Sequence, residues 1–141
     1  MTVIGIDFGD ARTGFASCDP MQTIACAQGI VKANGIENMI SATAAKIAEL
    51  GGEYLVIGCP VNMDGTKGHR AERCKRFAEG LSAVTGLEYE MVDERLTTVE
   101  AYTYMNITDT KGRKRKNVVD ALAAQIILQT WIDSQKNKND K

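Results

Sequence analysis

The sequence predicts a single α/β domain, in which helices flank a mixed sheet of three antiparallel and two parallel strands. Three observations support this prediction. Three short apolar segments follow one another at the amino terminus, with turn-forming residues between them. Helical periodicity then alternates with two further apolar segments, which is the order that produces parallel strands joined by crossover helices. The length of 141 residues is that of one domain, so residues 1–141 are expected to fold as one unit.

The amino-terminal half of the chain begins with a predicted antiparallel meander. Its three strands are expected at residues 2–7, 13–18 and 23–31. From residue 36 to residue 50, apolar residues recur at helical spacing before the pair Gly51-Gly52, which predicts a helix with a glycine stop. The continuous apolar run at 54–57 predicts a strand buried on both faces, as in a parallel sheet.

The carboxyl-terminal half is expected to add one strand and three helices. Apolar residues at helical spacing over 71–81 predict the second helix, and the alternation over 87–91 predicts the fifth strand. Capping-box spacing at 97–100 predicts a short third helix. The remaining segments are expected to be a basic loop over about 108–117, a long amphipathic helix from residue 118, and a flexible tail over about 134–141.

The overall charge does not point to a charged partner. Lys and Arg number 17 against 18 for Asp and Glu, so neither nucleic acid nor a membrane surface follows from the composition. No apolar run approaches the roughly 20 residues of a membrane-spanning helix, and no signal peptide precedes the first strand. The four cysteines lack C-x-x-C spacing, which is typical of reduced thiols. We therefore expect a soluble cytoplasmic protein with no membrane partner.

Acidic residues occur at three places where strands and helices are expected to converge. Asp7 closes the first strand, and Asp93 and Glu94 close the fifth. If these strands are parallel, both ends meet at the edge of the sheet where ligands bind in such folds. Asp120 has apolar neighbours three, four and seven residues further on, so it lies on or beside the apolar face of the last helix. The sequence thus brings acids from separate elements toward one point.

Each acid also has a simpler structural interpretation. Asp7 is suited to a turn, Asp120 to the helix dipole, and Glu94 to an ion pair with Arg12 or Arg95. Converging carboxylates repel each other, however, and such oxygen ligands suit Mg²⁺ or Mn²⁺. Two ions held ~3.5 to 4 Å apart clamp the attacking water and the leaving oxygen of a phosphodiester. Asp7, Glu94 and Asp120 therefore predict a nuclease site.

Four blocks of sequence occur in a fixed order along the chain. They are GIDFGDARTG at 5–14, IGCPVNMDGT at 57–66, VDERLTT at 92–98 and VDALAAQIILQ at 119–129. Together they resemble the YqgF family, also called RuvX or Holliday-junction-resolvase-like, over nearly the whole chain. The resemblance implies an RNase H-like fold and a bacterial cytoplasmic nuclease that matures the 5′ end of the small-subunit (16S) ribosomal RNA precursor. It also places Asp7, Glu94 with neighbouring Asp93, and Asp120 on the acidic positions of the family.

Other functions remain open at this stage. True junction resolvases place a carboxylate at the end of the fourth strand, where this chain has Gly58-Cys59-Pro60. The resemblance therefore supports phosphodiester hydrolysis more strongly than junction resolution, although a Holliday junction resolvase acting on DNA stays an alternative. A non-catalytic module that binds nucleic acid or a transcription factor is another. An ATP-binding, actin-like fragment also fits the opening motif, but such proteins clasp nucleotide between two domains.

Several cationic and amide side chains are expected to contact phosphates, which fix the register of a nucleic acid without reading its sequence. They are Arg12, Asn62, Lys67, Arg70 and Arg95, together with Arg113, Lys114 and Arg115 of the basic loop. The basic loop is equally consistent with a solvated surface. The expected partner is nucleic acid, structured RNA rather than DNA junctions, bound by a monomer or a homodimer.

Overall fold

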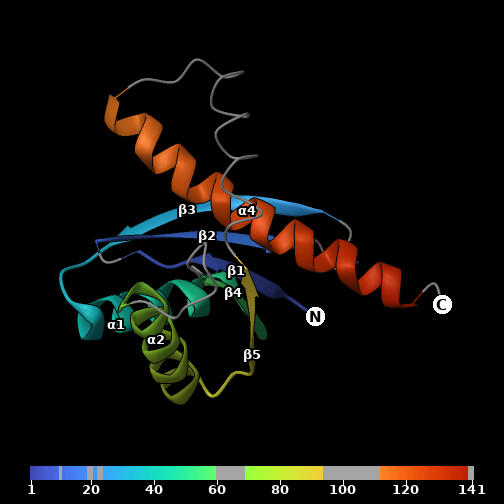
Figure 1. The fold of residues 1–141 in the computed structure, drawn as a ribbon, viewed down its shortest axis with the longest axis horizontal. Helices are drawn as coiled ribbons and strands as arrows, with labels where there is room; N and C mark the ends of the chain where they lie inside the picture. Colours follow the sequence, from blue (N-terminus) through green and yellow to red (C-terminus); the bar gives the residue numbers. More distant parts are fainter. Residues whose placement is uncertain (10, 19–20, 22–23, 60–68, 94–111, 140–141) are drawn as a thin grey trace.

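Five strands and three helices make up the described part of the fold (Figure 1). The computed structural model describes residues 1–9, 11–18, 21, 24–59, 69–93 and 112–139. The strands are β1 (Val3–Asp7), β2 (Arg12–Cys18), β3 (Ala25–Lys32), β4 (Tyr54–Cys59) and β5 (Tyr89–Asp93). The helices are α1 (Ile36–Leu50), α2 (His69–Thr85) and α4 (Gly112–Asn139).

All five strands form one sheet in the order β3-β2-β1-β4-β5. The pairs β1–β2 and β2–β3 are antiparallel, whereas β1–β4 and β4–β5 are parallel. The predicted mixed sheet is therefore confirmed. At one edge, which we call the carboxyl edge, β1 ends at Asp7, β4 at Cys59 and β5 at Asp93, and the antiparallel strand β2 begins there at Arg12.

Helices cover both faces of the sheet (Figure 1). α1 and α2 pack on one face, and α4 crosses the other. Successive residues of a strand point to opposite faces. On β1, Ile4 and Ile6 therefore join the core under α1 and α2, whereas Val3 joins the core under α4. The same alternation directs Asp7 to the α4 side of the sheet.

Two glycines allow α4 to lie very close to the sheet. A Cβ atom added to Gly5 would lie 2.7 Å from Cβ of Leu128 and 2.9 Å from the carbonyl oxygen of Ala124. A Cβ atom added to Gly58 would lie 2.2 Å from Cδ1 of Ile127. Contacts this short do not occur between real atoms, so the absence of side chains on β1 and β4 sets the distance between α4 and the strands.

The first helix and its end agree with the sequence prediction. α1 spans Ile36–Leu50, as expected, and Gly51 follows with a φ of 70°. The amide of Gly51 donates to the carbonyl oxygen of Ala48, and that of Gly52 to the carbonyl oxygen of Ile47. A left-handed glycine that satisfies the last carbonyls in this way is a common helix stop.

The bounds of α4 correct two sequence predictions. The helix begins at Gly112, so residues 112–117 of the predicted basic loop are helical and that part of the prediction is wrong. Arg and Lys are good helix formers, and packing of the later apolar stripe on the sheet stabilises the turns that precede it. The helix also continues to Asn139, through most of the predicted tail. The predicted short helix at 97–100 lies outside the described residues.

The cysteines whose side chains are described, Cys18, Cys26 and Cys74, are free thiols. Among the described helices, none is long and apolar enough to cross a membrane.

Candidate active site

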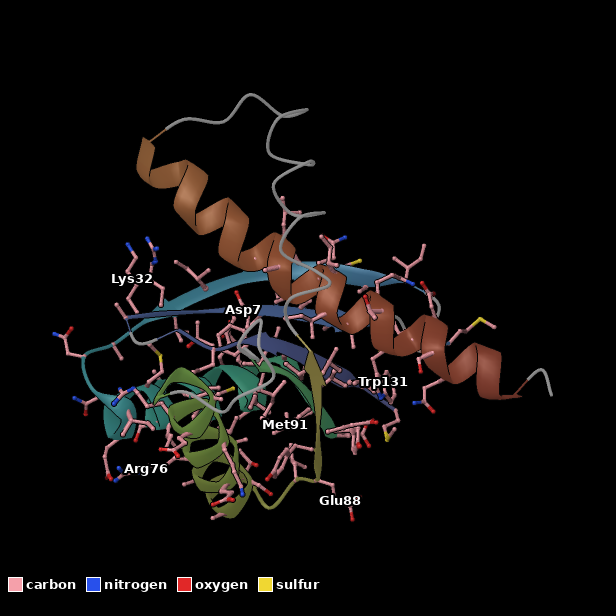
Figure 2. All side chains as sticks on the ribbon, viewed as in Figure 1. Asp7, Lys32, Arg76, Glu88, Met91 and Trp131 are labelled. Carbon is pink, nitrogen blue, oxygen red and sulfur yellow. The ribbon has the colours of Figure 1, made fainter. Side chains whose placement is uncertain are left out.

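Asp7 is the last residue of β1, and Figure 2 shows it near the middle of the molecule. The residue is buried, with an exposed fraction of 8%. In the sheet register it lies beside Gly14 of β2 and Gly58 of β4. Because both of these residues are glycine, no side chain of β2 or β4 lies directly opposite the carboxylate in the sheet. The environment of Asp7 on this face is therefore formed by α4 and by the connections at the carboxyl edge.

The turn between β1 and β2 fixes the end of β1. The amide of Gly9 donates to Oγ1 of Thr13, and the Thr13 hydroxyl donates to the carbonyl oxygen of Gly9, each at 3.5 Å. A Cβ atom on Gly9 would lie 2.3 Å from the carbonyl oxygen of Arg12, so only glycine fits. Phe8 also stacks on Phe77 of α2, with ring centroids 4.3 Å apart. These contacts hold Asp7 and Arg12 at the same edge.

Position 58 explains why this chain has no acid at the end of β4. Gly58 is level with Asp7 in the sheet, and the space that its side chain would need is filled by Ile127 of α4. An Asp or Glu at this position would have to displace the side chain of Ile127. The carbonyl oxygen of Gly58 accepts a hydrogen bond from the buried thiol of Cys74, at 3.4 Å.

Position 93 ends β5 at the same edge. Asp7 is level with Gly58, and Gly58 is level with Val92, so position 93 is one residue beyond the row that contains Asp7. Neighbouring strands lie about 4.8 Å apart, which puts the backbone at 93 about 10 Å from that of Asp7. The side chain of Asp93 and all of Glu94 lie outside the described residues.

Position 120 lies one helical turn from a direct contact with β1. Ala124 and Leu128 of α4 contact Gly5, and Trp131, further along α4, bonds to Glu90 near the start of β5. The amino-terminal part of α4 is therefore directed toward the carboxyl edge.

The distance from Ala124 to position 120 along α4 is close to the distance from Gly5 to Asp7 along β1. Position 120 precedes Ala124 by four residues, about 6 Å along a helix. Asp7 follows Gly5 by two residues, about 6.6 Å along a strand. Both steps lead toward the carboxyl edge, so the backbone at 120 lies on the carboxyl-edge side of the contact between Ala124 and Gly5. The side chain of Asp120 lies outside the described residues.

The predicted phosphate-contacting residues are placed unevenly. Arg12 is half-buried at the start of β2, on the strand next to Asp7. Arg70 lies in the first turn of α2, and 113–115 in the first turns of α4, as backbone positions only. Asn62, Lys67 and Arg95 lie outside the described residues. Sequence analysis missed Lys32 and Asn34, which line a cavity together with Arg12.

The side chains that the structure describes contain no group of three His, Cys, Asp or Glu residues able to hold a metal. Of the four candidate acids, Asp7 is the one whose side chain is described. Its carboxylate is the hard oxygen ligand that Mg²⁺ and Mn²⁺ prefer. The donor set proposed from the sequence, three carboxylates from separate elements, fits such a cation.

The sheet order and the two helical layers define an RNase H-like fold. The chain is similar to RuvC of Thermus thermophilus in complex with a Holliday junction substrate, with a TM-score of 0.62 and 14% identity over 97% of this chain and 96% of that chain. It is also similar to the Holliday junction resolvase of fowlpox virus, with a TM-score of 0.61 and 10% identity over 96% of this chain and 99% of that one. At these identities the likeness shows the fold alone.

The chain belongs to the RuvX family, whose model, described as "RuvX: Holliday junction resolvase", matches residues 1–134. A relative from Crocosphaera subtropica is 38% identical over 136 residues, covering 96% of this chain and 95% of the relative. One from Ruminiclostridium cellulolyticum is 38% identical over 137 residues, covering 94% of each chain. Both relatives bear the name "Putative pre-16S rRNA nuclease". The family resemblance seen in the four sequence blocks is thus confirmed.

Proposed function

We propose that this protein is a metal-dependent nuclease that processes the 5′ end of the small-subunit (16S) ribosomal RNA precursor in the bacterial cytoplasm. The observation that supports the proposal is the buried Asp7 at the carboxyl edge, toward which the amino-terminal part of α4 is also directed. Acids delivered by separate elements to one point are suited to a hard divalent cation. The names of the relatives support the nuclease activity and the RNA substrate.

Asp7, Glu94 and Asp120 are the residues proposed to hold Mg²⁺ or Mn²⁺. When bound, a pair of such ions supplies a water activated for attack and stabilises the leaving oxygen of the phosphodiester. Asp7 contributes a buried carboxylate whose position is set by the sheet. Asp120 contributes one from α4, whose height above the sheet is set by Gly5 and Gly58.

Strand alternation favours Glu94 over Asp93 as the direct ligand. On β5, Val92 packs in the core under α4, whereas Met91 packs in the core under α1 and α2. Position 93 is two residues from Met91 and so belongs to the same face of the sheet, which is the face opposite Asp7. We therefore assign Asp93 a role in orienting its neighbour. Arg12, Arg70, Arg95, Asn62, Lys67 and the cations at 113–115 are proposed to bind phosphates around this site.

The proposal is tested by cleavage of a 16S precursor fragment with and without Mg²⁺ or Mn²⁺. Asp7→Asn keeps the size of the side chain and removes its charge, so we expect cleavage to fall by more than the roughly 10- to 100-fold that loss of a partner behind a metal ligand costs. Glu79→Gln on the exposed surface of α2 is the matched control and should cleave normally. Full activity of Asp7→Asn, or cleavage that is unchanged by EDTA, would contradict the proposal.

Junction resolution is the second candidate function, because the family model carries that description. A four-way DNA junction and a DNA duplex therefore belong in the same substrate panel. Faster cleavage of the junction than of the RNA precursor would replace the RNA assignment and leave the metal site unchanged. Binding without cleavage of any substrate would favour the non-catalytic module.

A further inference from the structure

We propose that a cationic hollow at the carboxyl edge binds a backbone phosphate of the substrate strand beside the candidate active site. The hollow is a cavity of about 550 Å³ lined by Ala11, Arg12, Lys32, Ala33 and Asn34. It lies where β2 begins and β3 ends. The inference rests on the proposed function, since it assumes a nucleic acid bound at Asp7, and it adds a second binding site for that substrate.

Two cations on neighbouring strands line this hollow. Arg12 and Lys32 are direct partners in the antiparallel pairing of β2 with β3. Directly opposite residues have Cβ atoms about 4.5 to 5.5 Å apart, and like charges in such a pair destabilise the sheet. Among the described residues, none forms an ion pair with Lys32. An anion held between the guanidinium and the ammonium would turn this repulsion into attraction.

The two cations are on the same face of the sheet as Asp7. On β2, Ala16 packs under α4 and Phe15 under α1 and α2. Arg12 is four residues from Ala16 on the same strand and so shares its face. Arg12 and its partner Lys32 are therefore both on the α4 side. Figure 2 shows Lys32 on that side of the sheet, at the end of β3. A strand of nucleic acid whose scissile phosphate is at Asp7 and which continues across β2 and β3 would meet these cations.

The remaining lining residues are suited to a phosphate. Ala11 and Ala33 have small side chains, and the amide of Ala33 donates to the carbonyl oxygen of Ala11, at 3.2 Å, which joins two of the segments that line the hollow. Asn34 is exposed, and its amide group is able to donate to a phosphate oxygen. The carbonyl oxygen of Asn34 accepts a bond from Nδ2 of Asn38, at 2.7 Å, which fixes the backbone at this point.

The first test measures nucleic-acid binding in EDTA, so that no cleavage occurs, by fluorescence anisotropy over a range of salt concentrations. The probes are a labelled RNA hairpin and a labelled single-stranded RNA. Arg12→Ala/Lys32→Ala removes the one phosphate contact that the two cations share, so it should reduce the slope of log K against log salt by about 0.9 for the duplex and about 0.7 for the single strand. The control variant, Lys75→Ala/Arg76→Ala, removes the same two residue types from the exposed surface of α2 and should leave the slope unchanged.

The second test separates loss of binding from loss of folding. Lys32→Glu places a carboxylate opposite Arg12, so we expect a higher midpoint of thermal unfolding together with weaker binding of RNA. An unfolded or damaged protein would not show both effects.

The outcomes distinguish this inference from the proposed function. Suppose that the wild type binds and cleaves RNA, while Arg12→Ala/Lys32→Ala and Lys32→Glu keep the salt slope of the wild type. The hollow is then not a phosphate site, and the nuclease proposal stands. If the wild type binds no nucleic acid, the nuclease proposal fails as well. A slope that falls equally in the control variant would indicate a non-specific charge effect and would also overturn the inference.

Discussion

At the scale of single residues, the end of the sheet opposite Asp7 contains a small polar cluster that fixes α4. Nε1 of Trp131 donates to Oε2 of Glu90, and the hydroxyl of Tyr54 donates to the same oxygen at 3.5 Å. The rings of Tyr54 and Trp131 lie 5.8 Å apart between centroids. One carboxylate thus joins β4, β5 and α4. This anchor determines where the other end of α4, with position 120, meets the carboxyl edge.

In this cluster, Tyr54 is expected to have an unusually high pKa. Burial raises the pKa of Tyr54, and the charges of Glu90 and Glu88 raise it further. The folded protein therefore holds this proton more tightly than the unfolded chain, so the stability from this group is present below the usual tyrosine pKa of about 10 and is lost as the pH rises above it. Comparing the ultraviolet titration of the wild type with that of Tyr54→Phe should show that Tyr54 ionises above the usual tyrosine pKa of about 10, and Glu90→Gln should lower its pKa. Ionisation of Tyr54 at or below the usual pKa would contradict this prediction.

At the scale of elements, the contact between α4 and the sheet depends on two glycines that differ in what surrounds them. Gly5 faces the backbone of Ala124 and the Cβ atom of Leu128, which cannot move without moving the helix. Gly58 faces the far end of the Ile127 side chain, which has other rotamers available. The same added methyl group should therefore have different consequences at the two positions.

We predict that Gly5→Ala destabilises the protein more than Gly58→Ala, with costs in the range of about 1 to 3 kcal/mol that is typical of overpacked cores. Chemical denaturation of both variants measures the difference. Ile127→Val removes the Cδ1 atom that an alanine at position 58 would meet, so the double variant Gly58→Ala/Ile127→Val should recover stability relative to Gly58→Ala. The same valine should not rescue Gly5→Ala. Equal costs at both glycines, or rescue of both, would refute this account of the packing.

The sequence predicted the elements well because their signals are local. The helix over 36–50 and the order of the five strands follow from periodicity and from turn residues. The start of α4 was wrong because charge in the segment 112–117 was taken as a loop signal, whereas helix formation there depends on packing further along the chain.

The candidate site was predicted only in part, for a different reason. Asp7 at the end of a buried strand is a local signal. Lys32 was missed because its pairing with Arg12 depends on the register of the hairpin, and that register shifts between Phe15 and Ala16. A count of residues outward from the turn misses such a shift, since an extra residue changes which side chains face each other.

At the scale of the whole molecule, the proposed site joins elements that are far apart in sequence. β1 lies at the amino terminus, and α4 begins at Gly112. A cation held by Asp7, Glu94 and Asp120 would link the sheet to the helix, whereas three carboxylates without a cation repel each other. Divalent metal should therefore contribute to the stability of the entire fold, and not only to activity.

This gives a prediction that does not depend on finding the substrate. Binding of Mg²⁺ at 100 times its dissociation constant stabilises the folded state by about 2.7 kcal/mol, which raises the melting temperature of the wild type by several degrees. Asp7→Asn and Asp120→Asn remove a ligand and part of the repulsion, so in EDTA they should melt at or above the wild-type temperature and respond little to Mg²⁺. Glu79→Gln should respond as the wild type does, and NaCl at matched ionic strength controls for screening. Two results would contradict this prediction: Asp variants that melt well below the wild type in EDTA, or Asp variants whose melting temperature Mg²⁺ raises as much as that of the wild type. In either case the acids do not form a shared metal site.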